Sequence, residues 1–242
     1  MEGKSPNQHM ATPNKKSTLM VVLTVAAGLI GWYMQNKDSN LLSSILSSPA
    51  SIITIDGLTP VKVTGKEYEV LENCTLFEHK HNDGDSFHIK HATGKDEIRL
   101  YFADTAESAY KTYGGGENNG ERLDEQAKDF GGLTREQTTK LGQIGKKRTL
   151  GLLKGKKFKV ITKRQPVTNR QTETRIYAFV VLENDGTEYY LHELLTQEGL
   201  VRHSTWGGDL PDGTPWRKQK ERLIAMENDA KKRKVGAWGM KK

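Results

Sequence analysis

The chain has 242 residues, of which 35% are apolar, so it can bury one good core and we expect one main domain. Lysine and arginine total 37 against 30 acidic residues, and the resulting formal charge of +7 suggests a polyanionic partner or an anionic membrane surface. The single cysteine, Cys74, excludes an internal disulfide framework and a cysteine-based zinc site.

The first feature along the chain is an uncharged segment of twenty residues, from Ser17 to Asn36. That length matches what a helix needs to cross a hydrocarbon core of about 30 Å. Basic residues before it favour a cytoplasmic tail at residues 1–16, with the rest of the chain outside the cytoplasm. We therefore expect a single-pass membrane anchor at 17–36. A cleaved signal peptide, which would release a secreted domain, and a buried helix are the alternatives.

A change of composition after the anchor predicts a flexible tether at 37–65 and a folded domain at 66–242. Short runs rich in Val, Ile, Tyr and Phe predict five strands, and these cover residues 68–77, 86–91, 97–103, 157–163 and 175–183. The Gly-rich stretch 110–132 is expected to be a mobile flap. Three helices are predicted, at 134–154, 191–200 and 216–235. Strands with helices inserted late indicate an α+β domain, with a barrel or a sandwich at its centre.

Two of the predicted helices carry start signals. Thr134 and Gln137 have the spacing of a capping box, which predicts that the first helix starts there. Thr214 and Pro215 precede the last helix as an expected N-cap and first helical residue.

Acidic residues flank the second and third predicted strands in an unusual order. The group consists of Asp83, Asp85, Asp104 and Glu107, with Arg99 between them. A hairpin that turns at Thr93-Gly94 would bring Asp85 and Asp104 together at one edge of a barrel. Carboxylate oxygens suit Ca²⁺ or Mg²⁺, and a cation, an arginine and a carboxylate base together suit attack on a phosphodiester. A solvated acidic turn neutralised by Arg99 is the alternative.

The same residues resemble a known family. The segments DGDSF and IRLYFADTAES are similar to the signature of the thermonuclease, or staphylococcal nuclease-like, family. TRIYAFVVLENDGTEYYLHELLTQEGLVR resembles the family's second characteristic segment, and AKKRKVGAWG resembles its C-terminal helix. The resemblance covers residues 66–239 approximately. It implies an OB-fold barrel of five strands with three helices, and a Ca²⁺-dependent phosphodiesterase that acts on DNA and RNA.

The resemblance also implies roles for individual residues. Glu107 would be the general base, and Arg99 and Arg175 would hold and polarise the scissile phosphate, a two-pronged task for which lysine is a poor substitute. The implied metal ligands are Asp85, Asp104 and the backbone carbonyl of Thr105, with Asp83 close by.

The chain departs from the family pattern at several positions. Ala106 stands where the family usually has proline, in the turn that aims Glu107. Residues 172–174 replace a basic and aromatic pair that often precedes the second arginine. The tyrosines that stack a base are not evident, although His203 and Trp206 lie in the corresponding region.

Basic residues and histidines offer further hypotheses. A run from Lys146 to Arg164 contains no acid, and a second cluster covers 231–234; each is either a solvated face or a surface that follows a nucleic-acid backbone. Four histidines suggest a competing hypothesis, a zinc site, at which at most three of them could converge. These are His79, His81, His88 and His91.

The sequence therefore predicts a membrane-anchored, monomeric, extracytoplasmic Ca²⁺-dependent nuclease that cleaves DNA, RNA or both. The alternative is a catalytically silent OB-fold module that binds nucleic acid or another polyanion. Because such modules typically lose the acids or arginines first, the presence of both in this chain favours the enzyme.

Overall fold

The computed structural model of the protein describes residues 57–167 and 175–240. The predicted membrane anchor at 17–36 lies outside these residues, and so does the tail before it. No helix within the described ranges is long and apolar enough to cross a membrane. Residues 57–65, which the sequence assigns to the tether, contact the domain, since the backbone and hydroxyl of Thr59 both donate to the Glu193 carboxylate at 2.6 Å.

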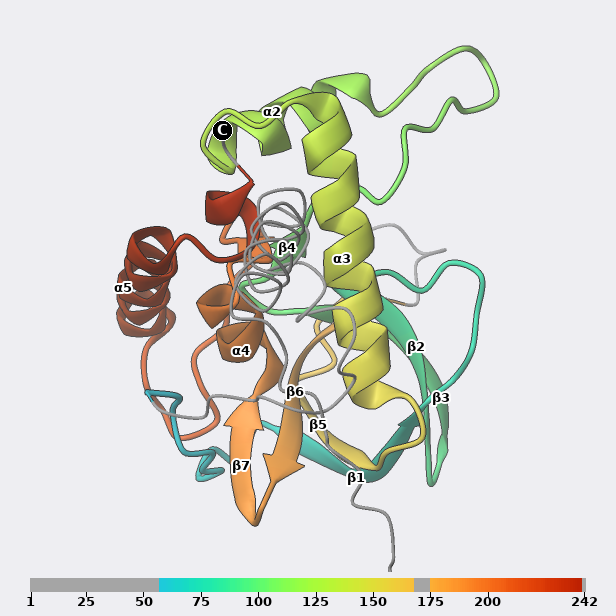
Figure 1. Cartoon of the computed structure of the whole chain (residues 1–242). Helices are drawn as coiled ribbons and strands as arrows, with labels where there is room; N and C mark the ends of the chain where they lie inside the picture. The colour runs from blue at the N-terminus through green and yellow to red at the C-terminus, as the bar shows by residue number, and fades with distance from the viewer. Residues whose placement is uncertain (1–56, 168–174, 241–242) are drawn as a thin grey trace, which may run out of the picture. The chain divides into compact units, whose positions relative to one another are not determined.

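A closed ring of five strands forms the centre of the domain (Figure 1). In order around the ring these are β1 (Glu69–Leu76), β2 (Ser86–His91), β3 (Gly94–Leu100), β6 (Ile176–Asn184) and β5 (Phe158–Thr162), which pairs back to β1. The pairing of β3 with β6 is parallel and the other four are antiparallel. This mixed barrel is consistent with an OB-fold and confirms the predicted α+β class.

The strands form where apolar residues alternate along the chain. In β2, Phe87 and Ile89 are two residues apart and fully buried, whereas Lys90, the residue after Ile89, is exposed. In β1 the register shifts between Leu71 and Cys74, and Asn73 there has a φ of 55°. Such a bulge bends and coils a strand, which helps the sheet to close on itself.

Three short strands lie outside the ring and were not predicted. β7 (Thr187–Tyr190) forms a hairpin with β6, and β4 (Asp104–Thr105) pairs with β8 (Val201–Arg202). β3 ends at Leu100, before the predicted end at 103, because buried Phe102 takes a left-handed φ of 64° and turns the chain. This turn places Asp104 on a separate strand.

The described residues contain four α-helices, one more than predicted. They are α2 (Gly120–Asp129), α3 (Arg135–Leu153), α4 (Leu191–Gln197) and α5 (Trp216–Arg233), followed by a 3-10 turn, η1 (Gly236–Gly239). The expectation of a flap throughout 110–132 is wrong for α2. Its buried residues Leu123 and Ala127, and Phe130 at its C-cap, recur at helical spacing and pack inward.

The predicted start of α3 is confirmed, whereas the predicted start of α5 is corrected by one residue. Thr134 and Gln137 form the predicted capping box at the start of α3, with both hydrogen bonds present. Pro215, predicted as the first helical residue of α5, is instead the N-cap, and the helix begins at Trp216.

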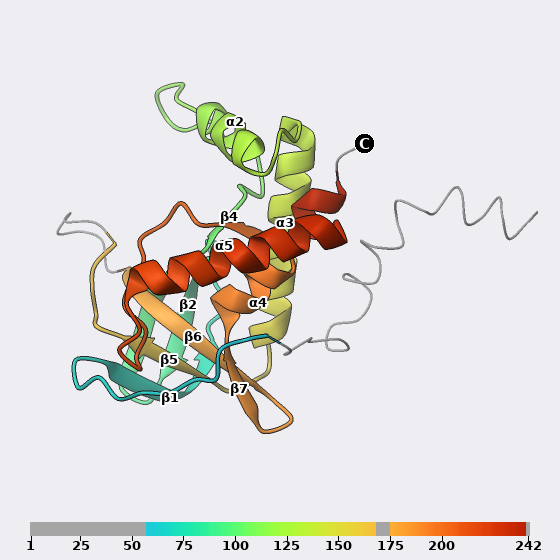
Figure 2. The same ribbon diagram turned by 90° about the vertical axis from the view of Figure 1, so that its left-hand side faces the viewer.

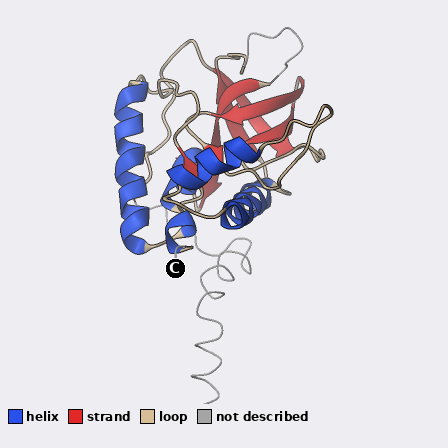
Figure 3. Cartoon of the chain, turned by 90° about the horizontal axis from the view of Figure 1, so that it is seen from above, coloured by secondary structure: helices blue, strands red, loops and turns tan. Residues whose placement is uncertain are grey.

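The helices gather on one side of the barrel, as seen from above in Figure 3. α4 packs against α5 and against the strands β6 and β7 (Figure 2). α2 follows the chain out of β4 and packs against α3. The first residues after β4, which include Glu107, therefore lie against α2 and α3.

Candidate active site

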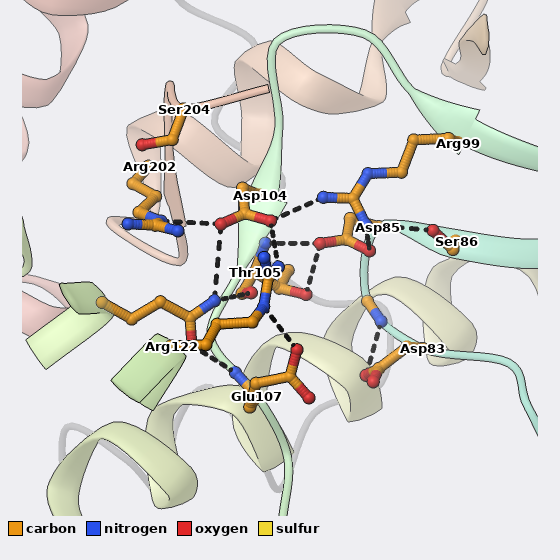
Figure 4. A network of polar contacts seen from close by, with 12 residues as sticks. Asp83, Asp85, Ser86, Arg99, Asp104, Thr105, Glu107, Arg122, Arg202 and Ser204 are labelled. Carbon is orange, nitrogen blue, oxygen red and sulfur yellow. Dashed lines mark hydrogen bonds and ion pairs between the residues drawn. The ribbon is translucent and has the colours of Figure 1, made fainter. Parts of the chain in front are cut away.

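Arg99 joins two buried carboxylates at the centre of the candidate site (Figure 4). Its Nη1 donates to Asp85 Oδ1 at 2.9 Å and its Nη2 to Asp104 Oδ1 at 2.5 Å. The side chains of Asp85 and Asp104 are only 6% and 3% exposed, so this contact is largely shielded from water. The predicted convergence of Asp85 and Asp104 is confirmed, and the β2–β3 hairpin produces it by pairing Ser86 with Arg99.

Asp85 also fixes the strand that carries Asp104. Its Oδ2 accepts hydrogen bonds from the backbone and hydroxyl of Thr105, at 2.7 and 3.0 Å. Gly84 lies so close to this strand that a Cβ atom there would sit 2.7 Å from the Thr105 methyl group. Glycine at position 84 is therefore required for this close approach.

Asp104 receives three guanidinium groups. In addition to Arg99, Arg122 Nη2 donates to Oδ1 at 2.8 Å and Arg202 Nε donates to Oδ2 at 2.6 Å. Burial alone would raise the pKa of Asp104, but the three arginines together lower it. For Asp85, burial is the dominant effect and raises the pKa although Arg99 opposes it.

Glu107, the predicted general base, lies beside this network and remains partly exposed, at 19% of its side chain. Arg122 Nε donates to its Oε1 at 2.7 Å, so one guanidinium spans Glu107 and Asp104. The turn that carries Glu107 is held by the buried amide of Gln126, whose Oε1 accepts from Glu107 N at 2.8 Å and whose Nε2 donates to the Thr105 carbonyl at 3.0 Å. Gln126 thus clamps the turn on both sides of Ala106, where the family pattern has proline.

Arg175 and Asp83 lie at the edges of the cluster. Arg175 Nη1 and Arg99 Nη1 both donate to the Ser86 hydroxyl, at 3.4 and 3.2 Å, so the two arginines converge from adjacent strands. Asp83 accepts from Gly84 N at 2.9 Å and from the Ser108 hydroxyl at 3.4 Å. Burial raises the pKa of Asp83, and the charge of Lys146 opposes this only in part.

Sequence reasoning missed three contacts of this site. Arg122 and Gln126 come from α2, which was interpreted as a flap, and Arg202 comes from the two-residue strand β8. For Gln126 the sequence offered one signal: it is three residues after Leu123, so a helix would bury it on the same face as Leu123 and Ala127. Nothing in the local pattern around Arg202 distinguishes it from a surface arginine.

The other candidate residues are distributed away from this network. Trp206 is 61% exposed, as a stacking side chain must be, whereas His203 is buried with its Nδ1 on the Phe102 carbonyl. The rings of His79 and His88 lie close together, with centroids 4.0 Å apart and planes tilted by 52°. Within residues 57–167 and 175–240, however, no group of three or more His, Cys, Asp or Glu side chains is arranged to hold a metal ion.

The oxygen donors of the site differ in how readily they could bind a hard cation. Asp85 is an oxygen donor whose burial is incompletely compensated by Arg99, so an added cation would be favoured there. Both oxygens of Asp104 already accept from arginines, and the Thr105 carbonyl accepts from Gln126. A cation held by Asp85 and Asp104 must therefore compete with guanidinium groups.

The fold and the site together define an α+β barrel protein with a buried carboxylate–arginine cluster at one end. Comparison with known proteins adds no assignment, since no protein-family model and no curated protein matches the chain.

Proposed function

We propose that the chain is a Ca²⁺-dependent nuclease that hydrolyses phosphodiester bonds of DNA, RNA or both. The observation that carries this proposal is the single network that joins Asp85, Arg99, Asp104 and Glu107. Two buried carboxylates beside converging arginines provide sites for a hard cation and for a phosphate, and a partly exposed carboxylate next to them provides a base.

Asp85, Asp104 and the Thr105 carbonyl would hold the cation, which when bound screens the phosphate charge and makes water more acidic. Glu107 would take the proton from the attacking water at its carboxylate. Arg99 and Arg175 would bind the non-bridging phosphate oxygens, because both already point at the Ser86 hydroxyl from neighbouring strands. To bind the phosphate, Arg99 must give up one of its hydrogen bonds to Asp85 or Asp104.

The second candidate is a catalytically silent module that binds a polyanion. It is favoured by the ion pairing of Asp104, whose carboxylate already contacts three guanidinium groups. Association with a membrane through residues 17–36 belongs to either proposal, and protease treatment of intact cells followed by fractionation tests it. A domain protected from the protease, or recovered in the soluble fraction, would contradict the anchored topology.

Nicking of a supercoiled plasmid by the full chain, with Ca²⁺ or with a chelator, separates the two candidates. We expect cleavage only with Ca²⁺, and Glu107→Gln should slow it by about 10² to 10⁴, the usual contribution of a positioned general base. Asp85→Asn should regain part of its activity as Ca²⁺ is raised, which Glu107→Gln should not. Plasmid binding without cleavage under every condition would establish the silent module.

A further inference from the structure

A groove runs along the outer face of α3, beside the candidate active site. One hollow of about 580 Å³ is lined by Ser108, by Lys146 and Lys147 of α3 and by Lys154 at its C-cap, with no acidic side chain among its lining residues. A second hollow of about 490 Å³ shares Gln143 with the first and reaches Tyr110. Both volumes are within the range of ligand sites. The second hollow is also lined by Arg135, Glu136 and Lys140. The two hollows adjoin at Gln143, and we call their combined surface the lysine groove.

The structure separates this groove from the rest of the basic run between Lys146 and Arg164. Four cations of that run are paired with acids from other elements: Arg148 with Glu198, Lys159 with Glu188, Lys163 with Glu67 and Arg164 with Glu69. Lys146 and Lys147 form no ion pair with any residue in the described ranges, and the Lys154–Glu78 pair is more than two-thirds exposed on both sides. Exposed pairs contribute little, so the groove keeps a net positive charge. Lys156 and Lys157 of the run also form no ion pair among the described residues, but they do not line the groove.

The groove adjoins the candidate general base. Ser108 directly follows Glu107, and its carbonyl accepts from Gln143 of α3 at 3.3 Å while its hydroxyl donates to Asp83 at 3.4 Å. Gln143, Lys147 and Lys154 lie on one helical face, so a chain bound along that face continues away from Glu107. An extended ligand in the groove would therefore run along α3, with one end near Glu107.

An aromatic side chain lies at the other hollow. Tyr110 is 54% exposed, and its ring edge lies near Gly120, where a Cβ atom would be 3.4 Å from the ring. Exposed aromatic rings beside lysines are the combination that binds single-stranded nucleic acid, because bases stack on the ring and phosphates pair with the cations. A base inside a duplex is already stacked on its neighbours and cannot cover this ring.

We propose that the lysine groove binds the single-stranded polynucleotide that flanks the scissile phosphate, with phosphates on Lys146 and Lys147 and a base on Tyr110. The proposal rests on the nuclease function above for its orientation, since the strand is placed relative to Glu107. It also assigns the substrate class of that site as a single strand several nucleotides long.

Binding by the full chain carrying Glu107→Gln tests the groove without cleavage. We expect Lys146→Ala with Lys147→Ala to weaken binding of a labelled single-stranded 12-mer by about tenfold or more, and to reduce the salt slope by about 1.4. The charge-matched control, Lys218→Ala with Lys232→Ala on α5, should leave the affinity and the salt slope unchanged.

The tyrosine is tested separately. Tyr110→Ala should weaken binding by about tenfold and Tyr110→Phe by less than about threefold. Equal losses in the groove and control pairs, or a Tyr110→Ala variant that binds normally, would overturn the proposal. So would a 12-mer duplex that shows the same dependence on Tyr110.

Cleavage by the otherwise unchanged chain then separates the groove from the chemistry. The two substrates are the single-stranded 12-mer and the nitrophenyl ester of thymidine 5′-phosphate, which is too short to reach along α3. In the Lys146 and Lys147 double variant, the ratio of the 12-mer rate to the ester rate should fall about tenfold. An unchanged ratio with active protein contradicts the groove and leaves the nuclease in place. If neither substrate is cleaved while binding still depends on the lysines, the nuclease fails and the groove stands.

Discussion

At the scale of single residues, Asp85 and Asp104 illustrate how neighbouring carboxylates acquire opposite properties. Both are buried, but Asp104 accepts from three arginines and has a lowered pKa, whereas Asp85 contacts one arginine and has a raised pKa. Arg122 contributes to this difference and also holds Glu107. Its side chain is 42% exposed, so it can leave the site more easily than Arg99, which is 14% exposed.

We predict that Arg122→Ala tightens Ca²⁺ binding by about fivefold, because a half-exposed guanidinium that competes for Asp104 Oδ1 contributes about 1 kcal/mol. Calorimetric titration of the full chain with Ca²⁺, in the absence of substrate, measures this change. Arg135→Ala is the matched control, since Arg135 pairs with exposed Asp124 at the neighbouring surface of α2. Unchanged or weaker binding in Arg122→Ala would show that the arginine does not compete with the cation.

At the scale of elements, two helices hold the turn from Asp104 to Glu107 on opposite sides. α2 supplies the Gln126 amide, which binds the backbone on both sides of Ala106. α3 approaches through Gly142, where a Cβ atom would collide with the carbonyl oxygens of Ala106 and Glu107, the latter at 2.5 Å. The position of the candidate base is thus determined by packing of helices rather than by the turn alone.

Gly142→Ala should therefore displace this turn, lowering the free energy of unfolding by about 1–3 kcal/mol as overpacking does. Cleavage should fall by up to about 10², since a misplacement of about 1 Å is sufficient for such a loss. Gly151→Ala is the control in the same helix, because no atom lies within 4 Å of its added Cβ. This control should gain up to about 1 kcal/mol from helix propensity. Urea unfolding and single-turnover cleavage measure the two effects, and a Gly142→Ala variant as stable as Gly151→Ala would contradict the packing argument.

At the scale of the whole molecule, the barrel and helices share a core that contains a histidine. His192 of α4 is fully enclosed, with its ring centroid 5.5 Å from that of Phe102 and 5.6 Å from that of Phe179. Its Nε2 lies 3.1 Å from the Gln219 amide nitrogen of α5, which indicates that this ring nitrogen accepts a hydrogen bond from the amide. Burial lowers the pKa of His192 to about 4, so the folded protein keeps the ring neutral at pH 5.

This histidine predicts a loss of stability in acid. The unfolded chain binds a proton at His192 below about pH 6.5, whereas the folded chain does so only near pH 4, so the free energy of unfolding falls as the pH drops through that window. The loss approaches about 3 kcal/mol at the lower limit. His203, whose pKa is also lowered by burial, acts in the same direction.

Urea unfolding of the full chain at pH 7 and pH 4.5 tests the contribution of His192. We expect His192→Gln to show a smaller difference between the two pH values than the parent, because glutamine does not titrate. His81→Gln, at an exposed position, is the control and should behave as the parent. An equal difference in all three proteins would assign the acid sensitivity to other groups.

The sequence by itself determined those parts of the molecule that depend on neighbouring residues. Alternating apolar residues predicted the five barrel strands to within a few residues, and the Thr134–Gln137 spacing predicted the start of α3. The meeting of Asp85 and Asp104 was predictable in part, because a tight hairpin fixes the register of β2, which follows Asp85, and β3, which precedes Asp104. The turn at Phe102 then places Asp104 on β4. In each case the interactions that decide the structure lie within one turn or one hairpin.

Only the tertiary structure decided which distant groups meet at Asp104 and Glu107. Arg202 is 98 residues from Asp104 along the chain, and its two-residue strand is too short to produce a periodic signal. Arg122 reaches the site only because a Gly-rich stretch ends in a helix that packs against α3. The ion pairs that distinguish Arg148 and Lys159 from Lys146 and Lys147 likewise join different elements. Such contacts depend on how the barrel closes and where the helices pack, and local periodicity carries no information about either.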